Sequence, residues 1–173
     1  LVVHNCGCRV VQKLFDLMPI EKLEPLVQEV LLDAPNLAVN QYGNYVVQNI
    51  LEAGKKEHIA ALIKAFSTHF YKFSMHKFAS NVIEQCIRGS NEEERNIIFS
   101  EIIGREDHYE YQRIKDMVSD QFGNYVIQRI LEFGTENQKY AIYTAVYNYY
   151  DYLINITYAK HVIAKLKELR YKF

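Results

Sequence analysis

Apolar residues along this chain follow the spacing of helices rather than that of strands. Between His58 and Phe66, the residues Ile59, Leu62 and Ile63 share one side with Phe66, which predicts an amphipathic α-helix. A later segment repeats this spacing at Tyr140, Ile142, Tyr143, Val146 and Tyr147. No long stretch alternates with a period of two, so the pattern predicts an all-α fold with two or three short helices in each unit.

Glycines and prolines mark where these helices begin and end. Gly54 and Gly134 each follow an apolar segment, at the position expected for a helix stop. Pro19, Pro25 and Pro35 stand where turns or first helical residues are expected. The helices are therefore predicted to be short and to be joined by tight connections.

A nine-residue phrase returns along the chain. Its copies occupy residues 4–12, 40–48, 76–84 and 120–128, and a worn fifth copy occupies 157–164. Counted from the residue after a shared Gly or Ala (8, 44, 80, 124 and 160), the intervals are 36, 36, 44 and 36 residues. A period of this size is typical of stacked repeat proteins, so we expect an α-solenoid.

The repeat pattern also suggests a division of the chain. We expect one array across residues 1–173, with a partial repeat at 1–38, repeats at 39–74, 75–118 and 119–155, and a C-terminal cap at 156–173. The first copy of the phrase begins within four residues of Leu1, which leaves no room for the helix before it. We therefore interpret the chain as the C-terminal piece of a longer array, because such arrays need a polar cap at each end.

Within each phrase, three positions are predicted to lie together on a surface. A small residue comes first, and a Val/Ile pair that faces the core begins three residues later, as at Val46 and Val47. Residues one and four positions apart share one side of a helix. The resulting triplets are Cys8/Arg9/Gln12, Asn44/Tyr45/Gln48, Ser80/Asn81/Glu84 and Asn124/Tyr125/Gln128. The small residues, Gly7, Gly43, Ala79, Gly123 and Ala159, allow either close helix packing or close approach of a ligand.

Each triplet offers two edge groups around one flat group, which suits an unpaired nucleic-acid base. Glu84 can accept both donors of the guanine Watson–Crick edge, N1–H and N2–H. The Gln48 amide matches O4 and N3–H of uracil while Asn44 donates to O2, and Gln128 with Asn124 repeats that pair. The Gln12 amide matches adenine, and Cys8 tolerates its C2–H. Cytosine is harder to exclude, because an amide can flip to suit it.

The overall charge sets a condition on this hypothesis. The net charge is −1 and the pI is about 6.7, whereas general polyanion binders usually lie above pI ~9. Nucleic-acid binding would therefore depend on base contacts and on local basic residues. Candidates for phosphate contact are Lys13, Lys77, Arg129, Lys160 and Lys165, and simple solvation of these residues is an equal alternative.

Other functional classes receive little support from the sequence. The three cysteines are not spaced as metal ligands, and their odd number suits a reducing compartment, the cytoplasm or the nucleus, of which we expect the cytoplasm. No apolar run approaches the ~18–20 residues of a membrane span. Catalytic motifs are missing, so we expect neither an enzyme nor a cofactor. His4 and His76 occupy equivalent positions, where helix capping is the favoured role.

With these residues in view, the chain resembles the Pumilio (PUF) family of RNA-binding proteins. The phrases Cys-Arg-Val-Val-Gln at 8–12, Asn-Tyr-Val-Val-Gln at 44–48 and Ser-Asn-Val-Ile-Glu at 80–84 carry the resemblance. The order of the copies resembles repeats five to eight followed by the C-terminal cap. The resemblance implies a right-handed superhelical crescent of three-helix repeats, similar to armadillo and HEAT arrays, with RNA antiparallel along its concave face.

The resemblance also implies roles for particular residues. Asn124/Gln128, Ser80/Glu84, Asn44/Gln48 and Cys8/Gln12 would read U, G, U and A, giving 5′-UGUA-3′. Stacking would fall to Arg9, Tyr45, Asn81 and Tyr125, with His161 available for the 5′ uracil. The family further implies binding to messenger RNA 3′ untranslated regions, translational repression and decay, and recruitment of corepressors and deadenylase machinery.

Two segments between the phrases have open interpretations. The polar stretch 104–111 is either a flexible surface loop or, as the resemblance implies, a docking site for protein corepressors. A tyrosine stripe at Tyr140, Tyr143, Tyr147 and Tyr150 is expected to pack between repeats. The rival overall interpretations are a protein-binding solenoid, which would lack base-reading triplets, and a shape-reading relative acting in ribosome assembly, which would have eroded ones.

Overall fold

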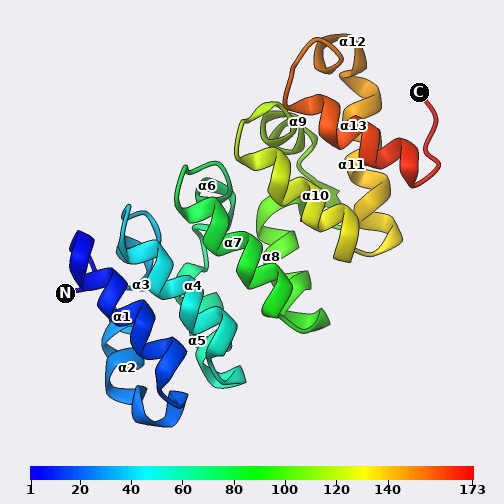
Figure 1. The fold of residues 1–173 in the computed structure, drawn as a ribbon. Coiled ribbons are helices and arrows are strands. Elements are labelled where there is room, and N and C mark those ends of the chain that lie inside the picture. Colours follow the sequence, from blue (N-terminus) through cyan, green and yellow to red (C-terminus); the bar gives the residue numbers. More distant parts are fainter.

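The computed structural model describes all 173 residues, and it shows an elongated stack of short helices (Figure 1). Five helices that carry the repeated phrase form one row along the stack: α1 (Asn5–Leu17), α4 (Gly43–Ala53), α7 (Ala79–Gly89), α10 (Gly123–Phe133) and α13 (Ala159–Glu168). Each packs on the next member of the row. We call these five the motif helices, and the stack is an α-solenoid, as the repeat pattern predicts.

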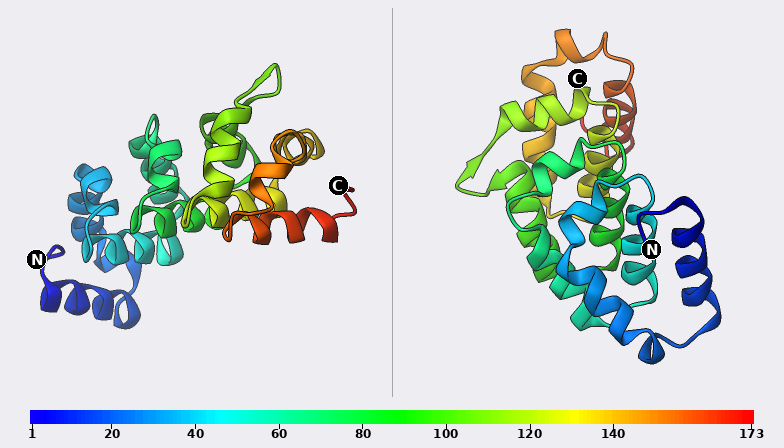
Figure 2. Two further views of the ribbon diagram at one scale, coloured as in Figure 1. Left: turned by 90° about the horizontal axis from the view of Figure 1, so that it is seen from above. Right: turned by 90° about the vertical axis from the view of Figure 1, so that its left-hand side faces the viewer.

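The remaining helices lie on the other side of the row (Figure 2). Four back helices follow the first four motif helices in the chain: α2 (Glu24–Leu32), α5 (Lys56–Phe66), α8 (Glu92–Ile103) and α11 (Glu136–Asn148). Short helices lead into the next motif helix: α3 (Ala34–Ala38), α6 (Phe70–Ser74), α9 (Tyr111–Ser119) and α12 (Tyr150–Leu153). A 3₁₀ turn, Ile20–Lys22, precedes α2.

The first four motif helices start in the same way, through a side chain at the head of the phrase. Asn40 Oδ1 accepts hydrogen bonds from the backbone N–H groups of Tyr42 and Gly43, and Asp120 Oδ1 does the same two and three residues ahead. At the equivalent positions, Nδ1 of His4 and of His76 is the acceptor. These contacts satisfy N–H groups that a helix start leaves free, which confirms the capping role of both histidines.

The small residue of the phrase allows the motif helix to start directly on the preceding short helix. A Cβ atom added to Gly123 would lie 2.9 Å from the Met117 carbonyl oxygen, and one on Gly43 would lie 3.0 Å from that of Leu37. Close helix packing, the first of the two alternatives for these residues, is therefore what the structure shows. The Val/Ile pairs of α4, α7 and α10 are fully buried beneath them, as predicted, whereas Val10 of α1 is exposed.

The predicted turn residues stand at helix ends. Gly54 and Gly134 are the C-caps of α4 and α10. Pro25 and Pro35 lie in the first turns of α2 and α3, and Pro19 precedes the 3₁₀ turn. One continuous cluster of buried apolar residues extends from Cys8 to Leu166, so the stacked units share a single core.

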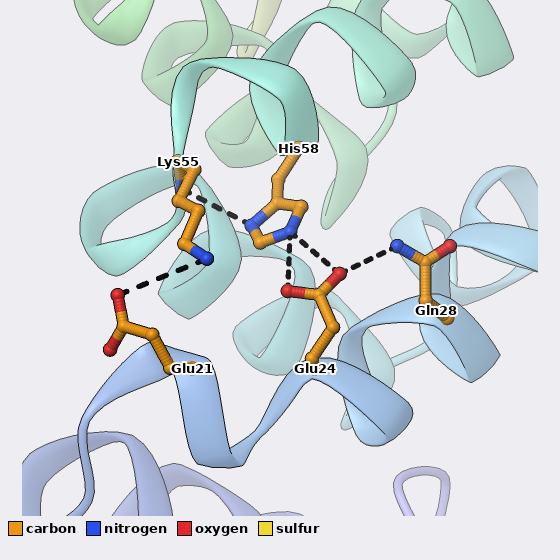
Figure 3. Close-up of polar contacts among 5 residues, drawn as sticks. All are labelled: Glu21, Glu24, Gln28, Lys55 and His58. Carbon is orange, nitrogen blue, oxygen red and sulfur yellow. Dashed lines mark hydrogen bonds and ion pairs between the residues drawn. The ribbon is translucent and has the colours of Figure 1, made fainter.

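A buried histidine, His58 of α5, forms a hydrogen bond to Glu24 of α2 and so connects the first two back helices (Figure 3). His58 Nδ1 accepts the backbone N–H of Lys55 at 3.1 Å, which leaves the proton on Nε2. Nε2 then donates to the Glu24 carboxylate at 3.1 Å, and Gln28 donates to the same carboxylate at 2.8 Å. The hydrogen bond from Gln28, followed by that from His58, lowers the pKa of Glu24. These contacts fix α2 against α5 across a repeat boundary.

The connection after α8 departs from the all-helical expectation. Strands β1 (Gly104–Arg105) and β2 (His108–Tyr109) form a short antiparallel hairpin, with Gly104 opposite Tyr109. Gly104 has φ +89°, a conformation that favours glycine. The hairpin projects from the stack (Figure 2), and it lies within the one interval of 44 residues. The segment is therefore ordered as a hairpin.

The tyrosine stripe of α11 and α12 packs only in part, since Tyr143 and Tyr150 are half-buried against the core and the other two tyrosines do not pack between repeats. Tyr140 and Tyr147 are exposed. Tyr143 stacks on Tyr171 with ring centroids 4.8 Å apart, and Tyr150 stacks on Phe173 at 5.1 Å. The C-terminal tail folds back over the outer surface of the last units, where these rings offer it a large apolar surface.

None of the helices is long and apolar enough to cross a membrane.

Candidate nucleic-acid interface

The row of motif helices brings the four predicted triplets to one side of the stack, with two of the three positions open to solvent. The second position is exposed in every triplet, at Arg9, Tyr45, Asn81 and Tyr125, and Tyr45 retains 51% of its surface. The last residue of every triplet, which lies four positions after the first, is half-buried: these residues are Gln12, Gln48, Glu84 and Gln128. These positions agree with the predicted display of flat groups and edge groups along a surface.

The first position of each triplet contradicts that display. Cys8, Asn44, Ser80 and Asn124 are all buried, and Asn44 retains only 2% of its surface. This position falls in the first turn of the motif helix, where its side chain turns back toward the residues before the helix. Asn44 Nδ2 donates to the Asn40 carbonyl at 2.8 Å, and Asn124 Nδ2 donates to the Asp120 carbonyl at 2.9 Å. The helical spacing alone did not reveal this local hydrogen bonding.

The buried asparagines hold the glutamines beside them. Gln48 Nε2 donates to Asn44 Oδ1 at 3.0 Å, and Gln128 Nε2 donates to Asn124 Oδ1 at 3.1 Å. One amide N–H is used in each bond, so each glutamine retains an oxygen acceptor and a second N–H. The two triplets of identical sequence therefore present the same oriented amide at the surface.

A hollow of about 360 Å³ lies between α1 and α4. Its lining includes all of the first triplet, Cys8, Arg9 and Gln12, together with Tyr45 of the next one. A flat guanidinium and a flat phenol ring thus border the same space, and two edge groups line it as well. This geometry suits a planar ligand that is stacked on its faces and hydrogen-bonded along one edge.

Glu84 is the acidic member of the row and has a different environment. Its side chain is 23% exposed, and its nearest cationic partner is Arg129 of α10, whose Nε lies 3.6 Å from Oε2. Burial raises the pKa of Glu84, while Arg129 and then Arg88 act in the opposite direction. A carboxylate in this position can accept two parallel N–H donors from a single planar ligand.

The candidate phosphate residues differ in how far they are already engaged. Lys13 pairs with Asp16 at 3.4 Å, Lys77 lies over the Phe78 ring, and Lys165 lies 3.9 Å from Glu168. Lys160 is exposed. Arg129 is held between Glu84 and Glu132 with 19% of its side chain exposed, so it is the least suited of the five to reach a phosphate.

The worn fifth copy completes the row without a base-reading pattern. Helix α13 packs against α10, and its Lys160, His161 and Ala164 are exposed. His161 therefore lies open at the end of the row, as a stacking role requires. The contact that sequence reasoning missed is the Arg129–Glu84 pair. Opposite charges at neighbouring positions of consecutive motif helices were its signal in the sequence.

Comparison with known proteins identifies the family. The model of the Pumilio-family RNA binding repeat matches residues 1–31, 34–65, 69–103 and 113–146, which is most of the chain. These four segments each include one triplet. The chain therefore belongs to the Pumilio family. The division at residues 39, 75 and 119 that the sequence suggested stays a prediction, because the matched segments begin at other points.

Individual relatives agree with this assignment. A Pumilio domain-containing protein of Schizosaccharomyces pombe is 29% identical over 95% of this chain and 23% of its own length, and Pumilio homolog 12 of Arabidopsis thaliana is 29% identical over 96% and 27%. The crystal structure of PUF-8 in complex with PBE-RNA is 29% identical with a TM-score of 0.81, covering 96% of this chain and 48% of that one. The chain thus spans about a quarter of these curated relatives and about half of that solved chain.

A more distant structure shows the same fold. The Puf4 RNA binding domain, bound to the HO endonuclease RNA 3′ UTR recognition sequence, is 21% identical with a TM-score of 0.82 and covers 97% of this chain and 50% of that one. The α-solenoid expected from the repeat pattern is confirmed by these structural neighbours.

Proposed function

We propose that this chain binds single-stranded RNA along the row of motif helices, with one base for each triplet and a preference for 5′-UGUA-3′. Family membership supports RNA as the ligand, and so does the RNA bound in the related PUF-8 structure. The observation that carries the proposal is the regular alternation, along one row, of exposed flat groups and half-buried edge groups.

The edge chemistry supports the order of bases. Gln48 and Gln128 are oriented identically by their asparagines, and each amide retains an acceptor for N3–H and a donor for O4 of uracil. Glu84 accepts the two donors of guanine, and Gln12 beside Cys8 pairs with adenine. If the RNA runs antiparallel to the chain, Asn124/Gln128 contacts the first base and Cys8/Gln12 the fourth.

The buried first position changes the proposed role of the asparagines. Since Asn44 and Asn124 already hold the neighbouring glutamine, we assign them the task of orienting that amide for uracil. Asn124 Nδ2 donates to the carbonyls of both Asp120 and Gln121, so the direct contact with the base falls to Gln128 in that triplet. In this way the first position affects base choice although little of it reaches solvent.

Further steps of the proposal follow from the family. The bound RNA would lie in messenger RNA 3′ untranslated regions in the cytoplasm, where the protein represses translation or promotes decay. The hairpin at 104–111 is the proposed contact for protein corepressors, because it projects from the stack and exposes Arg105, Asp107 and His108. Deadenylase machinery is a proposed partner on the same grounds.

Fluorescence-anisotropy titration with short labelled RNAs tests the function. We expect UGUA-containing RNA to bind more tightly than RNA with UAUA, UGCA or AGUA in the same flanks. Each mismatch should cost about 1–3 kcal/mol, or roughly five- to 100-fold in affinity. Equal affinity for all four RNAs would refute base reading and would favour a protein-binding solenoid.

A further inference from the structure

Arg129 and Glu84 meet across the boundary between two motif helices. Glu84 is the last residue of the triplet on α7, and Arg129 directly follows Gln128, the last residue of the triplet on α10. Arg129 Nε lies 3.6 Å from Glu84 Oε2, and Nη1 forms a hydrogen bond to Glu132. Only about a fifth of each side chain, 19% for Arg129 and 23% for Glu84, is exposed. The guanidinium is therefore held beside the carboxylate from the next unit.

The distance between the two groups is informative. N–H···O hydrogen bonds span about 2.7–3.2 Å, so 3.6 Å allows charge attraction without a hydrogen bond. The Arg129 Nε atom is buried and has no hydrogen-bond partner. Arg129 consequently supplies positive charge beside Glu84 without using up the lone pairs of the carboxylate. Both oxygens keep the capacity to accept N–H donors from a base.

The ionisation state of Glu84 decides which base it fits. An ionised carboxylate is an acceptor only, and it matches N1–H and N2–H of guanine. A protonated carboxyl group presents one O–H donor beside one carbonyl acceptor, which matches N1 and N6–H of adenine instead. Burial alone favours the protonated form, because it raises the pKa of Glu84, and the positive charge of Arg129 opposes that shift.

The charges around Glu84 come from three helices. From α10, Arg129 faces it, with Glu132 bound to the far side of the guanidinium. Arg88 lies one turn further along α7 and also lowers the pKa of Glu84. On α4 the charged residue is Glu52, which accepts a hydrogen bond from Gln85. Arg129 is the largest of the favourable influences on the carboxylate.

The residue directly after the proposed base reader, which is the last residue of the triplet, is uncharged in α4 and α7, but it is Lys165 in α13, which follows the neutral reader Gln128. On α4, the helix after the one that carries the neutral reader Gln12, this residue is Asn49. On α7, the helix after the one that carries the neutral reader Gln48, it is Gln85. Arginine stands at this position only in the helix that follows the acidic reader. Arg129 is thus the arginine at this position, and it lies beside the acidic reader Glu84.

We propose that Arg129 is a specificity-positioning residue, which acts through Glu84 to keep its carboxylate free and ionised so that guanine is selected over adenine. This inference rests on the proposed RNA-binding function. It replaces the sequence-based assignment of Arg129 to a phosphate contact, for which the guanidinium is poorly exposed.

The test measures the affinity of the chain for UGUA and UAUA RNA as a function of pH. In the unmodified chain, acidification through the raised pKa of Glu84 protonates the carboxylate, so UGUA affinity falls and the UGUA:UAUA ratio declines. In Arg129→Gln that decline should begin at a higher pH, because the positive charge that lowers the pKa of Glu84 is gone, and the ratio near neutral pH should fall by up to about tenfold. Arg129→Lys keeps the charge and should restore a profile close to that of the unmodified chain.

Two further variants make the result interpretable. Lys139→Gln removes one positive charge from α11, where Lys139 pairs with Glu136, and it should leave both the ratio and its pH dependence unchanged. Arg129→Met keeps the apolar part of the side chain and replaces Arg129→Gln if thermal melting shows that the latter does not fold.

The outcomes separate the two proposals. If Arg129→Gln weakens UGUA and UAUA equally, with the ratio and its pH dependence unchanged, Arg129 has only a structural or phosphate-binding role and the inference is wrong. If the unmodified chain itself does not distinguish UGUA from UAUA, the proposed function fails at Glu84.

Discussion

In the proposed RNA-binding mode, the motif helices α4 and α7 present base-reading side chains of different chemistry. In α4 the reader Gln48 is neutral and is held by a buried side chain of its own helix, Asn44. In α7 the reader Glu84 is charged and is accompanied by a side chain of the next helix, Arg129. An amide needs a fixed orientation to distinguish donors from acceptors, whereas a carboxylate needs to stay ionised. The supporting residue differs because the requirement differs.

This comparison has a consequence for how independent the repeats are. A reader supported within its own helix keeps its geometry when its neighbours change. A reader supported from the next repeat depends on that neighbour. We therefore expect substitutions around α4 to act locally, and those around α7 to couple two adjacent units.

The largest effect is expected from changing the charged reader into the neutral one. In Glu84→Gln, the side chain loses an acceptor for guanine and gains an amide that pairs with adenine. The preference at that base should reverse from guanine to adenine, with a change in the UGUA:UAUA ratio of about 100-fold, from two edge contacts of ~1–3 kcal/mol each.

Anisotropy titrations with both RNAs measure this reversal. Gln48→Glu is the matched change in α4, and it should create a requirement for guanine at the third base. Because Gln85 rather than an arginine stands at the supporting position of α7, the new carboxylate should discriminate less well than Glu84 does. An unchanged ranking of RNAs in Glu84→Gln would refute its assignment as the guanine reader.

The flat residues should contribute to affinity without contributing to base choice. Tyr45→Ala removes a stacking surface that is exposed beside the hollow between α1 and α4. Stacking is worth about 1–3 kcal/mol per base, so binding of every RNA in the panel should weaken about tenfold.

Asn81→Ala in α7 is the comparison for that loss. Asn81 is exposed like Tyr45 but offers a smaller flat surface, so its removal should cost about threefold. Both losses are read from the same titrations, at equal ratios between RNAs. A loss confined to one RNA sequence would show that these residues take part in base reading.

Among the changes in base choice, the smallest are expected from the buried first positions. Asn44→Ala removes the acceptor that orients Gln48, so the amide can flip and should accept cytosine about fivefold better relative to uracil. Ser80→Ala in α7 should leave guanine selection nearly unchanged, because Glu84 has no hydrogen bond to Ser80. Titration with UGUA and UGCA tests the first variant, and a melting curve shows whether each variant folds.

Much of this protein was predictable from the order of its residues. The period of about 36 residues and the Val/Ile pairs indicated a helical solenoid, because a repeated apolar face can be buried only by stacking. Capping by His4 and His76 was also predictable, since it depends on residues two and three positions away. The glycine and proline positions set the helix ends for the same local reason.

The site was only partly predictable. Spacing identified the triplets but placed all three positions on the surface, because a helical projection ignores the turn in which a helix begins. The burial of Asn44 and its bond to the Asn40 carbonyl come from that first turn. The hairpin at 104–109 and the packing of the C-terminal tail on Tyr143 and Tyr150 involve segments with no repeated pattern to follow.

By itself, the sequence determined the fold class, the spacing of the repeated phrase and the chemical identity of each proposed reader, since these follow from periodic burial and from side-chain chemistry. Only the tertiary structure decided which residue supports each proposed reader, and whether that residue lies in the same helix or in the next motif helix. Gln48 is held within its helix, whereas Glu84 is paired with Arg129, which lies 45 residues later in the chain. Contacts across so long a separation depend on how consecutive helices pack, which the residue spacing within one helix does not determine.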